Sequence, residues 1–413
     1  TTAQTQAASP YRWTIAAVLL PLQFSMGLNF FGPAALFPLI MDDFQISRGT
    51  VSLLVVAVTL AQVLLLIPGG ILAARLGSRK AITLAGLLIS LGVLGGFGPS
   101  FPLLVGLRVC FGIGASILLP ATSTVVVQWF RAKELPYVNG VNMGVPGLGV
   151  GTAMFIGVPL ASALGWEGVF FVYGAFTLLA TLAWGVLARS SPMEGPAHGS
   201  LTIKELLGVV RERNTLLLSL ASIAPLALFV GYSSWLPTYY NEVFGMSLQR
   251  ASALVTIIPL LGAIVNASSG LLLDRAGIRK PFLVVPCIIL PVAAIGTFAT
   301  NNQAVIIPAI MLLGMASSIF MPALFTVAME LPGITPQRVA LVISTVLTLG
   351  NLGAAISPWA VGASTDRLGS YLPSLFALAL LPLLTVVAGS LLPETGPKAA
   401  ARRDRQHTPA PVG

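Results

Sequence analysis

One arginine stands inside an apolar stretch of this sequence, and it offers the clearest chemistry in the chain. Arg108 lies within the apolar run 102–130. Burying a guanidinium in hydrocarbon is costly unless the group faces a wet cavity or a partner. Its planar fork of donors matches the oxygens of a carboxylate, a nitrate or a phosphate. We therefore expect Arg108 to bind an anion. The alternatives are that it snorkels to the outer interface or bonds to backbone carbonyls.

Polar and aromatic side chains in other apolar runs are further candidates for lining a binding cavity. They are Gln23, Asn29, Asn142, Tyr232, Trp235, Tyr239, Asn266 and Asn351. Tyr232, Trp235 and Tyr239 follow the spacing i, i+3 and i+7, which places them on one face of a helix. By depth, Asn29, Arg108 and Tyr232 could meet in one cavity, although an aromatic stripe also serves packing.

The acidic residues indicate what such a cavity does not bind. All 13 lie at the ends of apolar runs or between them, with Glu330 and Asp366 nearest. A site for organic cations normally keeps a carboxylate in its cavity, so an anion is favoured. Proton coupling through a mid-membrane carboxylate also lacks a candidate. The chain has no nucleotide-binding Gly-Lys-Ser/Thr motif, zinc constellation or nucleophile motif. We therefore expect no catalytic residue, no cofactor and no metal, and hence no enzyme.

The composition shows what must position these residues. Of the 413 residues, 56% are hydrophobic and 8% charged, whereas soluble domains carry about 25% charged residues. The mean hydropathy is +0.91. A bilayer-spanning helix needs about 20 mostly apolar residues. We expect an all-α integral membrane protein with twelve such helices, at 12–38, 50–74, 81–98, 102–130, 137–162, 166–188, 215–240, 249–273, 281–299, 303–329, 338–363 and 371–392.

The basic residues predict the orientation of these helices. They gather in alternate loops, and the positive-inside rule then places both termini in the cytoplasm of a cell with a plasma (inner) membrane. The net charge of +9 is thus a topology signal with attraction to the lipid bilayer, and not a nucleic-acid footprint. The predicted division is an N-terminal six-helix bundle (1–188), a cytoplasmic linker (189–214), a C-terminal six-helix bundle (215–392) and a cytoplasmic tail (393–413).

A loop motif occurs once in each half of the chain. In the first half it comprises Gly70, Ala74, Arg75, Gly77, Arg79 and Lys80, and in the second Gly270, Asp274, Arg275, Gly277, Arg279 and Lys280. The glycines permit a tight turn between helices, and the cations hold one membrane surface. Two similar bundles in the same orientation predict an axis along the membrane normal, as in transporters that rock about a central site.

This loop resembles the best-known signature of the major facilitator superfamily, and the likeness covers nearly the whole chain. Ala74 departs from it, because the family has Asp there. The segment from Arg108 to Gly114 looks like the family's fourth-helix motif. Gln128-Trp129-Phe130, Gly165-Trp166 and the segment from Trp235 to Tyr239 resemble the organic-anion and sugar-acid symporter branches.

The resemblance implies a function and a gating role for the loops. It implies alternating-access transport of a small organic anion, a monocarboxylate or sugar acid, with protons as the coupling ion, by a monomer. Alternative interpretations are an inorganic anion transporter of the nitrate type, a multidrug efflux antiporter and a non-transporting receptor. The acidic residue of the motif helps latch the two halves, so the expected gating residues are Gly70, Arg75, Gly77, Arg79, Asp274, Arg275, Gly277 and Arg279.

Overall fold

The computed structural model describes residues 10–131, 134–189, 208–209, 211–331, 336–396 and 398. These residues form helices and connecting turns, with no strand among them. Most of the predicted linker 189–214 and of the predicted tail 393–413 lies outside the described residues.

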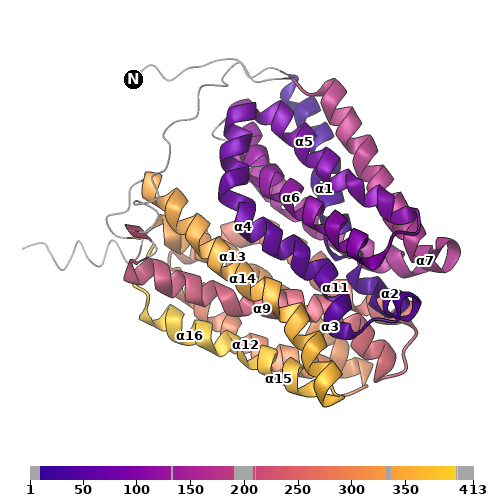
Figure 1. Ribbon diagram of the computed structural model, residues 1–413. Helices are drawn as coiled ribbons and strands as arrows, with labels where there is room; N and C mark the ends of the chain where they lie inside the picture. The colour runs from indigo at the N-terminus through magenta and orange to yellow at the C-terminus, as the bar shows by residue number, and fades with distance from the viewer. Residues whose placement is uncertain are drawn as a thin grey trace, which may run out of the picture.

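The N-terminal half forms one bundle (Figure 1). Its elements are α1 (Arg12–Phe31), η1 (Ala34–Leu36), α2 (Phe37–Phe44), α3 (Arg48–Val51), α4 (Leu53–Leu76), α5 (Ser78–Ser90), η2 (Leu91–Gly96), α6 (Phe101–Trp129) and α7 (Leu135–Leu187). Within this bundle α1 packs on α7, and α6 packs on α4 and α5.

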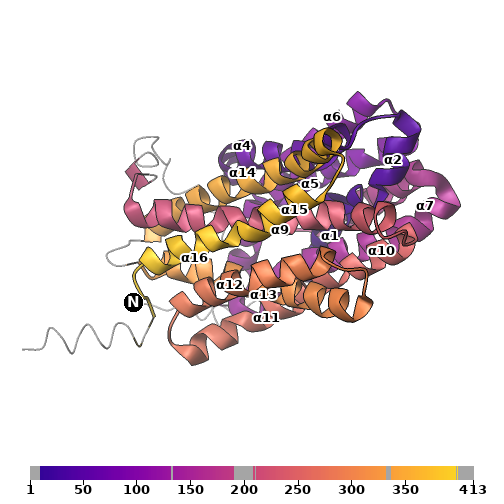
Figure 2. The same ribbon diagram turned by 90° about the horizontal axis from the view of Figure 1, so that it is seen from below.

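The C-terminal half forms the second bundle. Its elements are α9 (Arg213–Glu242), α10 (Leu248–Val255), α11 (Ile257–Ala276), α12 (Lys280–Phe298), α13 (Gln303–Met329), α14 (Pro336–Leu368), α15 (Leu372–Leu380) and α16 (Pro382–Leu391). Figure 2 shows α9, α16, α12 and α13 side by side, and each packs on the next in that order.

The number of membrane spans agrees with the sequence prediction of twelve. Eleven stretches of the described helices are long and apolar enough to cross a membrane, and the fifth, Gly140–Leu187, has 48 residues. A helix of that length would measure about 70 Å, more than twice the hydrocarbon thickness. It is broken at Gly165, which has φ +74° and ψ +167°, a conformation available almost only to glycine. The fifth stretch therefore supplies two spans.

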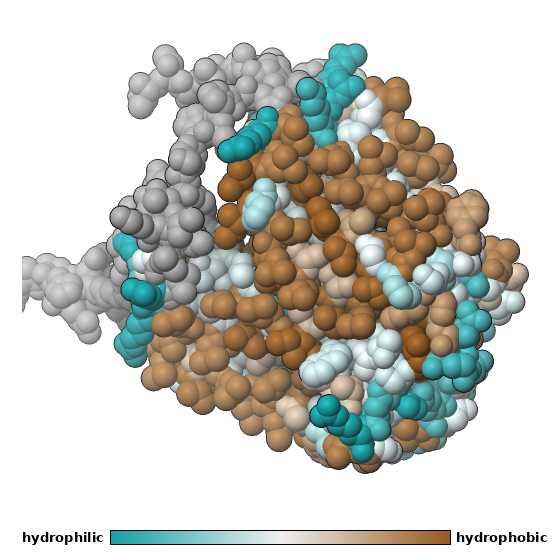
Figure 3. Space-filling view, viewed as in Figure 1, coloured by the Kyte–Doolittle hydropathy of each residue, from teal (hydrophilic) through white to brown (hydrophobic). Residues whose placement is uncertain are grey.

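Apolar side chains cover the outside of both bundles. Leu64, Val186 and Val292 are 64%, 78% and 72% exposed. In Figure 3 hydrophobic residues occupy the middle of the visible face, while hydrophilic ones gather toward its ends. So large an apolar surface has to face lipid.

The two ends of the molecule differ in charge. The turn after α4 and the turn after α11 lie at one end, here called the basic end because both carry the repeated Arg and Lys residues. Gly77 ends α4 with φ +78° and Gly277 ends α11 with φ +67°, as the motif predicts. The opposite end, here called the far end, contains α2, α3, the C-terminus of α9 and the turn between α14 and α15.

Small residues bring the bundles together along two seams. On α7, a side chain at Gly147 or Gly151 would meet Ala263 or Leu260 of α11 at 3.2 Å or 2.6 Å. On α14, one at Gly362 would meet the backbone oxygen of Arg48 at 2.6 Å. Such close approach is how helices associate in lipid, where the hydrophobic effect contributes little.

A matched pair of glycines tests this packing. A Cβ at Gly27 on α1 would lie 1.9 Å from the backbone oxygen of Pro146 on α7, whereas one at Gly106 on α6 would meet nothing within 4 Å. Gly27→Ala should lower the melting temperature in detergent, because α1 and α7 must separate. Gly106→Ala should leave it unchanged or raise it, since alanine is favoured over glycine in a helix by about 1 kcal/mol. Equal effects of the two substitutions would contradict the packing.

Candidate functional site

Arg108 lies on α6 and is 4% exposed. Each of its nitrogens donates to a backbone carbonyl: Nε to Leu54 at 2.7 Å, Nη1 to Asn29 at 2.7 Å and Nη2 to Phe30 at 2.8 Å. The guanidinium carbon also lies 4.8 Å from the centre of the Phe111 ring, within the range of a cation–π contact. One side chain thus ties α6 to α1 and α4.

The end of α1 explains why a cation belongs there. Pro33 has no backbone N–H, so the carbonyl of Asn29 cannot accept the usual helical bond from four residues on. Carbonyls at a helix C-terminus also carry partial negative charge. In hydrocarbon such groups need a donor, and Arg108 supplies it to Asn29 and Phe30.

Substrate binding by Arg108 stays a prediction. A guanidinium has five N–H donors, so bonds to three carbonyls leave capacity for a ligand. Arg108 and Asn29 line a cavity of about 20 Å³ with Gly32, Leu36 and Tyr173. That volume suits one water molecule and excludes an organic anion in this conformation.

Asn29 lies on α1 beside Arg108 and is likewise bonded within the N-terminal bundle. Its side-chain nitrogen donates to the backbone oxygen of Ser25 at 2.9 Å and to the hydroxyl of Thr177 at 3.0 Å. The structure therefore brings Asn29 and Arg108 together, as expected, and uses both to join helices of one bundle.

The three aromatic candidates on α9 lie in the core of the other bundle. The Tyr232 hydroxyl donates to Leu375, the Trp235 indole to Pro358 and the Tyr239 hydroxyl to Phe298, in each case to the backbone oxygen, at 2.8 Å, 2.8 Å and 2.9 Å. None is more than 2% exposed. Tyr232 does not line the cavity beside Arg108, so the expected meeting of Asn29, Arg108 and Tyr232 does not occur in this conformation.

Gln23 and Asn142 have a different environment. Gln23 on α1 is 3% exposed, and its side-chain oxygen has no hydrogen-bond partner among the described residues. Asn142 on α7 is 8% exposed and lines a cavity of about 260 Å³ between α1, α6 and α7. We call this the α1–α6–α7 cavity; its other lining residues include Trp13, Leu19, Leu20, Val125 and Phe130.

The two weaker candidates lie elsewhere. Asn351 on α14 donates to the backbone oxygen of Leu347 on its own helix at 2.8 Å. Asn266 on α11 is half-buried. Neither lines the cavity beside Arg108 or the α1–α6–α7 cavity.

The predicted gating arginines make contacts inside their own bundles. Arg79 donates to the backbone oxygen of Gly185 at 2.7 Å. Arg279 pairs with Glu330 at 3.0 Å, and its backbone N–H donates to Glu394 at 2.7 Å. Arg75 and Arg275 are exposed, and Gly70 lies within α4. The side chain of Asp274 lies outside the described residues, so the latch expected there stays a prediction.

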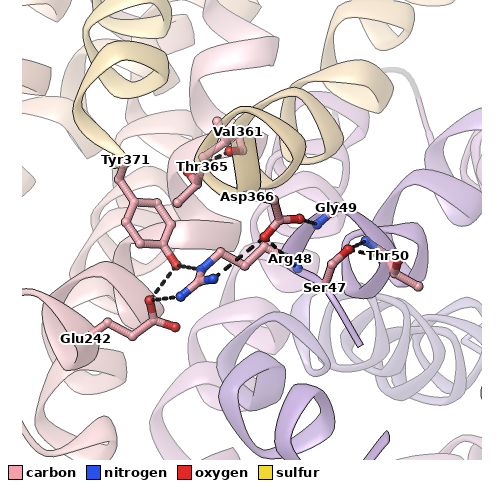
Figure 4. A network of polar contacts seen from close by, with 9 residues as sticks. All are labelled: Ser47, Arg48, Gly49, Thr50, Glu242, Val361, Thr365, Asp366 and Tyr371. Carbon is pink, nitrogen blue, oxygen red and sulfur yellow. Dashed lines mark hydrogen bonds and ion pairs between the residues drawn. The ribbon is translucent and has the colours of Figure 1, made fainter. Parts of the chain in front are cut away.

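A charged network at the far end joins the two bundles (Figure 4). Arg48 of the N-terminal bundle pairs with Glu242 at 2.7 Å and Asp366 at 3.6 Å. Its Nε donates to the Tyr371 hydroxyl at 2.8 Å, and that hydroxyl donates to Glu242 at 3.0 Å. We call Arg48, Glu242, Asp366 and Tyr371 the far-end network.

The backbone of the N-terminal bundle takes part as well. Asp366 accepts hydrogen bonds from the backbone N–H groups of Arg48 at 3.2 Å and Gly49 at 2.8 Å. These N–H groups begin α3, where free donors and the helix dipole favour an anion. A carboxylate from one bundle thus caps a helix of the other.

Tyr371 is held in its neutral form. Burial and the neighbouring Glu242 carboxylate raise the pKa of Tyr371 above its ordinary value, because both disfavour a phenolate. The protonated hydroxyl can therefore accept from Arg48 and donate to Glu242 at once.

Sequence reasoning missed the far-end network, although one signal was present. Basic residues are scarce in the loops at this end, so topology does not require an arginine at position 48. The available clue was an arginine that topology does not require, together with Asp366, one of the two acidic residues noted nearest to the apolar runs. Its pairing across the bundles depends on the fold and could not be found from spacing.

Two six-helix bundles in lipid, joined by small-residue seams and a charged network at one end, define the class of membrane transporters built from repeated bundles. The chain belongs to the Major Facilitator Superfamily, whose family model matches residues 19–334. The resemblance seen in the loop motif is thereby confirmed.

Relatives agree with this assignment. A probable sulfoacetate transporter of Cupriavidus necator is 26% identical over 258 residues, which cover 58% of this chain and 59% of that protein, so the chain spans about three fifths of its length. The 4-hydroxybenzoate transporter of Pseudomonas aeruginosa is 23% identical, with 94% of this chain and 93% of that one covered.

A solved structure shows the same fold. It is a bacterial homologue of the human lysosomal transporter Spinster, in an inward-facing and unoccupied conformation. It matches this chain with a TM-score of 0.74 at 19% identity and covers 94% of this chain and 95% of its own.

The role of Arg108 can be tested by two substitutions. Arg108→Ala leaves three buried carbonyls without this donor, and each such loss costs about 1–3 kcal/mol. Its melting temperature without ligand should therefore fall clearly, and that of Arg108→Lys less, because an ammonium can keep some of the bonds. Arg75→Ala is the exposed control. An unchanged melting temperature for Arg108→Ala would contradict the helix-joining role. If Arg108→Lys also loses the rise in melting temperature that an anion causes in the unmodified protein, the result would support contact between Arg108 and the substrate.

Arg48→Ala should loosen the far end. The two ion pairs are partly exposed, so together we assign them only about 1–2 kcal/mol, which corresponds to a five- to thirtyfold change in a two-state equilibrium. Hydrogen–deuterium exchange of the amides around residues 45–52 should accelerate by that factor. Arg250→Ala removes an exposed arginine at the same end and should have no effect. Equal exchange in both variants would show that the network does not hold the bundles.

Proposed function

We propose that the protein is a secondary active transporter that moves a small organic anion across the membrane by alternating access of its two bundles. The observation that carries the proposal is the asymmetry between the ends. At the far end, Arg48 of one bundle pairs with Glu242 and Asp366 of the other. At the basic end, described cations bond within their own bundle: Arg79 donates to the backbone oxygen of Gly185 at 2.7 Å and Lys280 to that of Leu392 at 3.1 Å.

The distribution of charge supports an orientation and a location. Because the basic end carries the cationic loops, the positive-inside rule assigns it to the cytoplasm. The far-end network then closes the outer side, and this conformation faces inward. We place the protein in the plasma (inner) membrane as a monomer with both termini cytoplasmic.

Two observations support an anionic substrate. Among the described residues, the charged side chains that are buried are Arg108 and Arg279, both of them cations. Both relatives described above are named as transporters of organic acids. A cation in the cavity would need a carboxylate partner, and the described interior of the bundles offers none.

Coupling and gating follow from the acidic residues. We propose protons as the coupling ion. Glu242 and Asp366 are carboxylates that bridge the bundles and face the outside in this orientation.

For the cytoplasmic side we propose a latch at Asp274 that the first half lacks, because Ala74 stands at the matching position. Comparing Asp274→Asn with Ala74→Ser by hydrogen–deuterium exchange at the basic end tests this; equal and negligible shifts would reduce the motif to topology.

Uptake into proteoliposomes tests the function. Reconstituted protein should accumulate organic anions from a panel of monocarboxylates and sugar acids, and an inward proton gradient should increase accumulation. Quaternary ammonium ions should not be taken up. Saturable uptake of a quaternary ammonium ion, with no response to any anion, would overturn the proposal, and uptake of anions without any effect of the gradient would overturn proton coupling alone.

A further inference from the structure

The α1–α6–α7 cavity is large enough for a small organic molecule. Its volume is about 260 Å³, slightly below the range of about 300–1,000 Å³ found for pockets that bury drug-sized ligands. Its walls are almost wholly apolar: of the twelve described residues that line it, Asn142 alone has an amide side chain. Trp13 and Phe130 form an edge-to-face pair there, with ring centres 5.5 Å apart.

Two buried polar groups without partners lie one helical turn beyond this cavity, toward the far end. Leu19 and Leu20 of α1 line the cavity, so Gln23 follows them on the same helix face. On α6 the lining residues are Val125 and Val126, and Thr122 precedes them in the same way.

One oxygen of each side chain is unsatisfied in this conformation. Gln23 is 3% and Thr122 is 4% exposed. The Gln23 side-chain oxygen and the Thr122 hydroxyl have no hydrogen-bond partner among the described residues. Buried polar groups are rarely left so unless a ligand or water completes them.

We propose that the transported anion is a carboxylate with an apolar body, such as an aromatic acid, and that it binds in the N-terminal bundle with its body in the α1–α6–α7 cavity and its carboxylate at Gln23 and Thr122. This inference rests on the proposed function and narrows its substrate class. An amide can turn by 180° to present its N–H₂ donor, and a hydroxyl can donate, so both groups can bind carboxylate oxygens.

The sequence left a monocarboxylate and a sugar acid open as substrates, and the apolar walls of the cavity favour a monocarboxylate with an apolar body. A sugar acid would bury several hydroxyl groups against apolar side chains with one lining amide to bind them. Each unpaired hydroxyl lowers affinity by about tenfold or more. An aromatic ring needs no such partners and can pack against the edges of Trp13 and Phe130.

Positive charge near the cavity suits an anion. Arg12, which precedes the lining residue Trp13, pairs with Glu134 at 3.1 Å, and the exposed Arg131 follows the lining residue Phe130, so these two cations outnumber the one carboxylate. Cations at the rim of a low-dielectric cleft raise the local concentration of anions. A lipid acyl chain is the competing occupant, but it would leave Gln23 and Thr122 without partners.

Binding measurements on the purified full chain in detergent test the proposal, with benzoate, gluconate and benzyltrimethylammonium as probes. Benzoate should bind at least tenfold more tightly than gluconate, and the cation should not bind. Gln23→Leu should weaken benzoate ten- to a hundredfold, as expected for a lost bond to a charged group. Its melting temperature without ligand should stay the same or rise, because an unsatisfied buried amide is removed.

A second variant fills the cavity. Ala16 lines it, so Ala16→Phe should abolish benzoate binding. The matched controls are Gln249→Leu at an exposed position and Val186→Phe on the 78% exposed surface of α7, and both should bind benzoate as the unmodified protein does.

The outcomes separate this inference from the proposed function. Gluconate binding as tightly as benzoate would overturn the inference and leave anion transport standing. Benzoate affinity unchanged by both Gln23→Leu and Ala16→Phe would show that the ring of benzoate binds elsewhere. If detergent chains displace benzoate equally from the unmodified protein and from Gln23→Leu, the cavity would be assigned to lipid. Failure of every anion to bind or to be transported would overturn the proposed function itself.

Discussion

A polar group inside hydrocarbon needs a partner, and this requirement organises the protein. It explains Arg108, which supplies donors to carbonyls of α1 and α4 where Pro33 interrupts the helical bonding. It also explains why Tyr232, Trp235 and Tyr239 each donate to a backbone oxygen of a neighbouring helix. Polar groups that are partnered in this way fix each bundle as a rigid unit. Groups that remain unpartnered, such as the side-chain oxygen of Gln23, are the ones for which we propose a role in substrate binding.

Alternating access needs bundles that are firm inside and separable from one another. The seams between the bundles use small residues, Gly147 and Gly151 against α11 and Gly362 against the backbone of Arg48. These contacts are close but carry few polar bonds. The far-end network adds a charged contact, and its ion pairs are partly exposed to water. Partial exposure keeps their strength modest, so the far end can close and open again at low cost.

The sequence predicted the fold well because its signals are local. Apolar run length marked the spans, including the break between 162 and 166 that falls at Gly165, and Gly77 and Gly277 marked the turns. The sequence predicted the site less well, because the hydrogen bonds and ion pairs of the site join residues that are far apart in the chain. Nothing in the spacing of Arg108 shows that the end of α1 lies beside it, and nothing near Arg48 shows that Glu242 and Asp366 do. Gln23 was chosen as a polar residue in an apolar run, and only the packing shows that it lacks a partner.

Alternating access is tested most directly by measuring both ends of the molecule under the same conditions. Spin labels at positions 45 and 249 report the far end, and labels at 80 and 275 report the basic end, in protein whose Cys110 and Cys287 are replaced by serine. Pulsed electron-spin distances would be recorded in nanodiscs with and without a transported carboxylate. Under alternating access, the carboxylate should raise the population with a longer far-end distance and a shorter basic-end distance. Distances that stay unchanged at both ends, or that change in the same direction, would contradict alternating access around a bound anion.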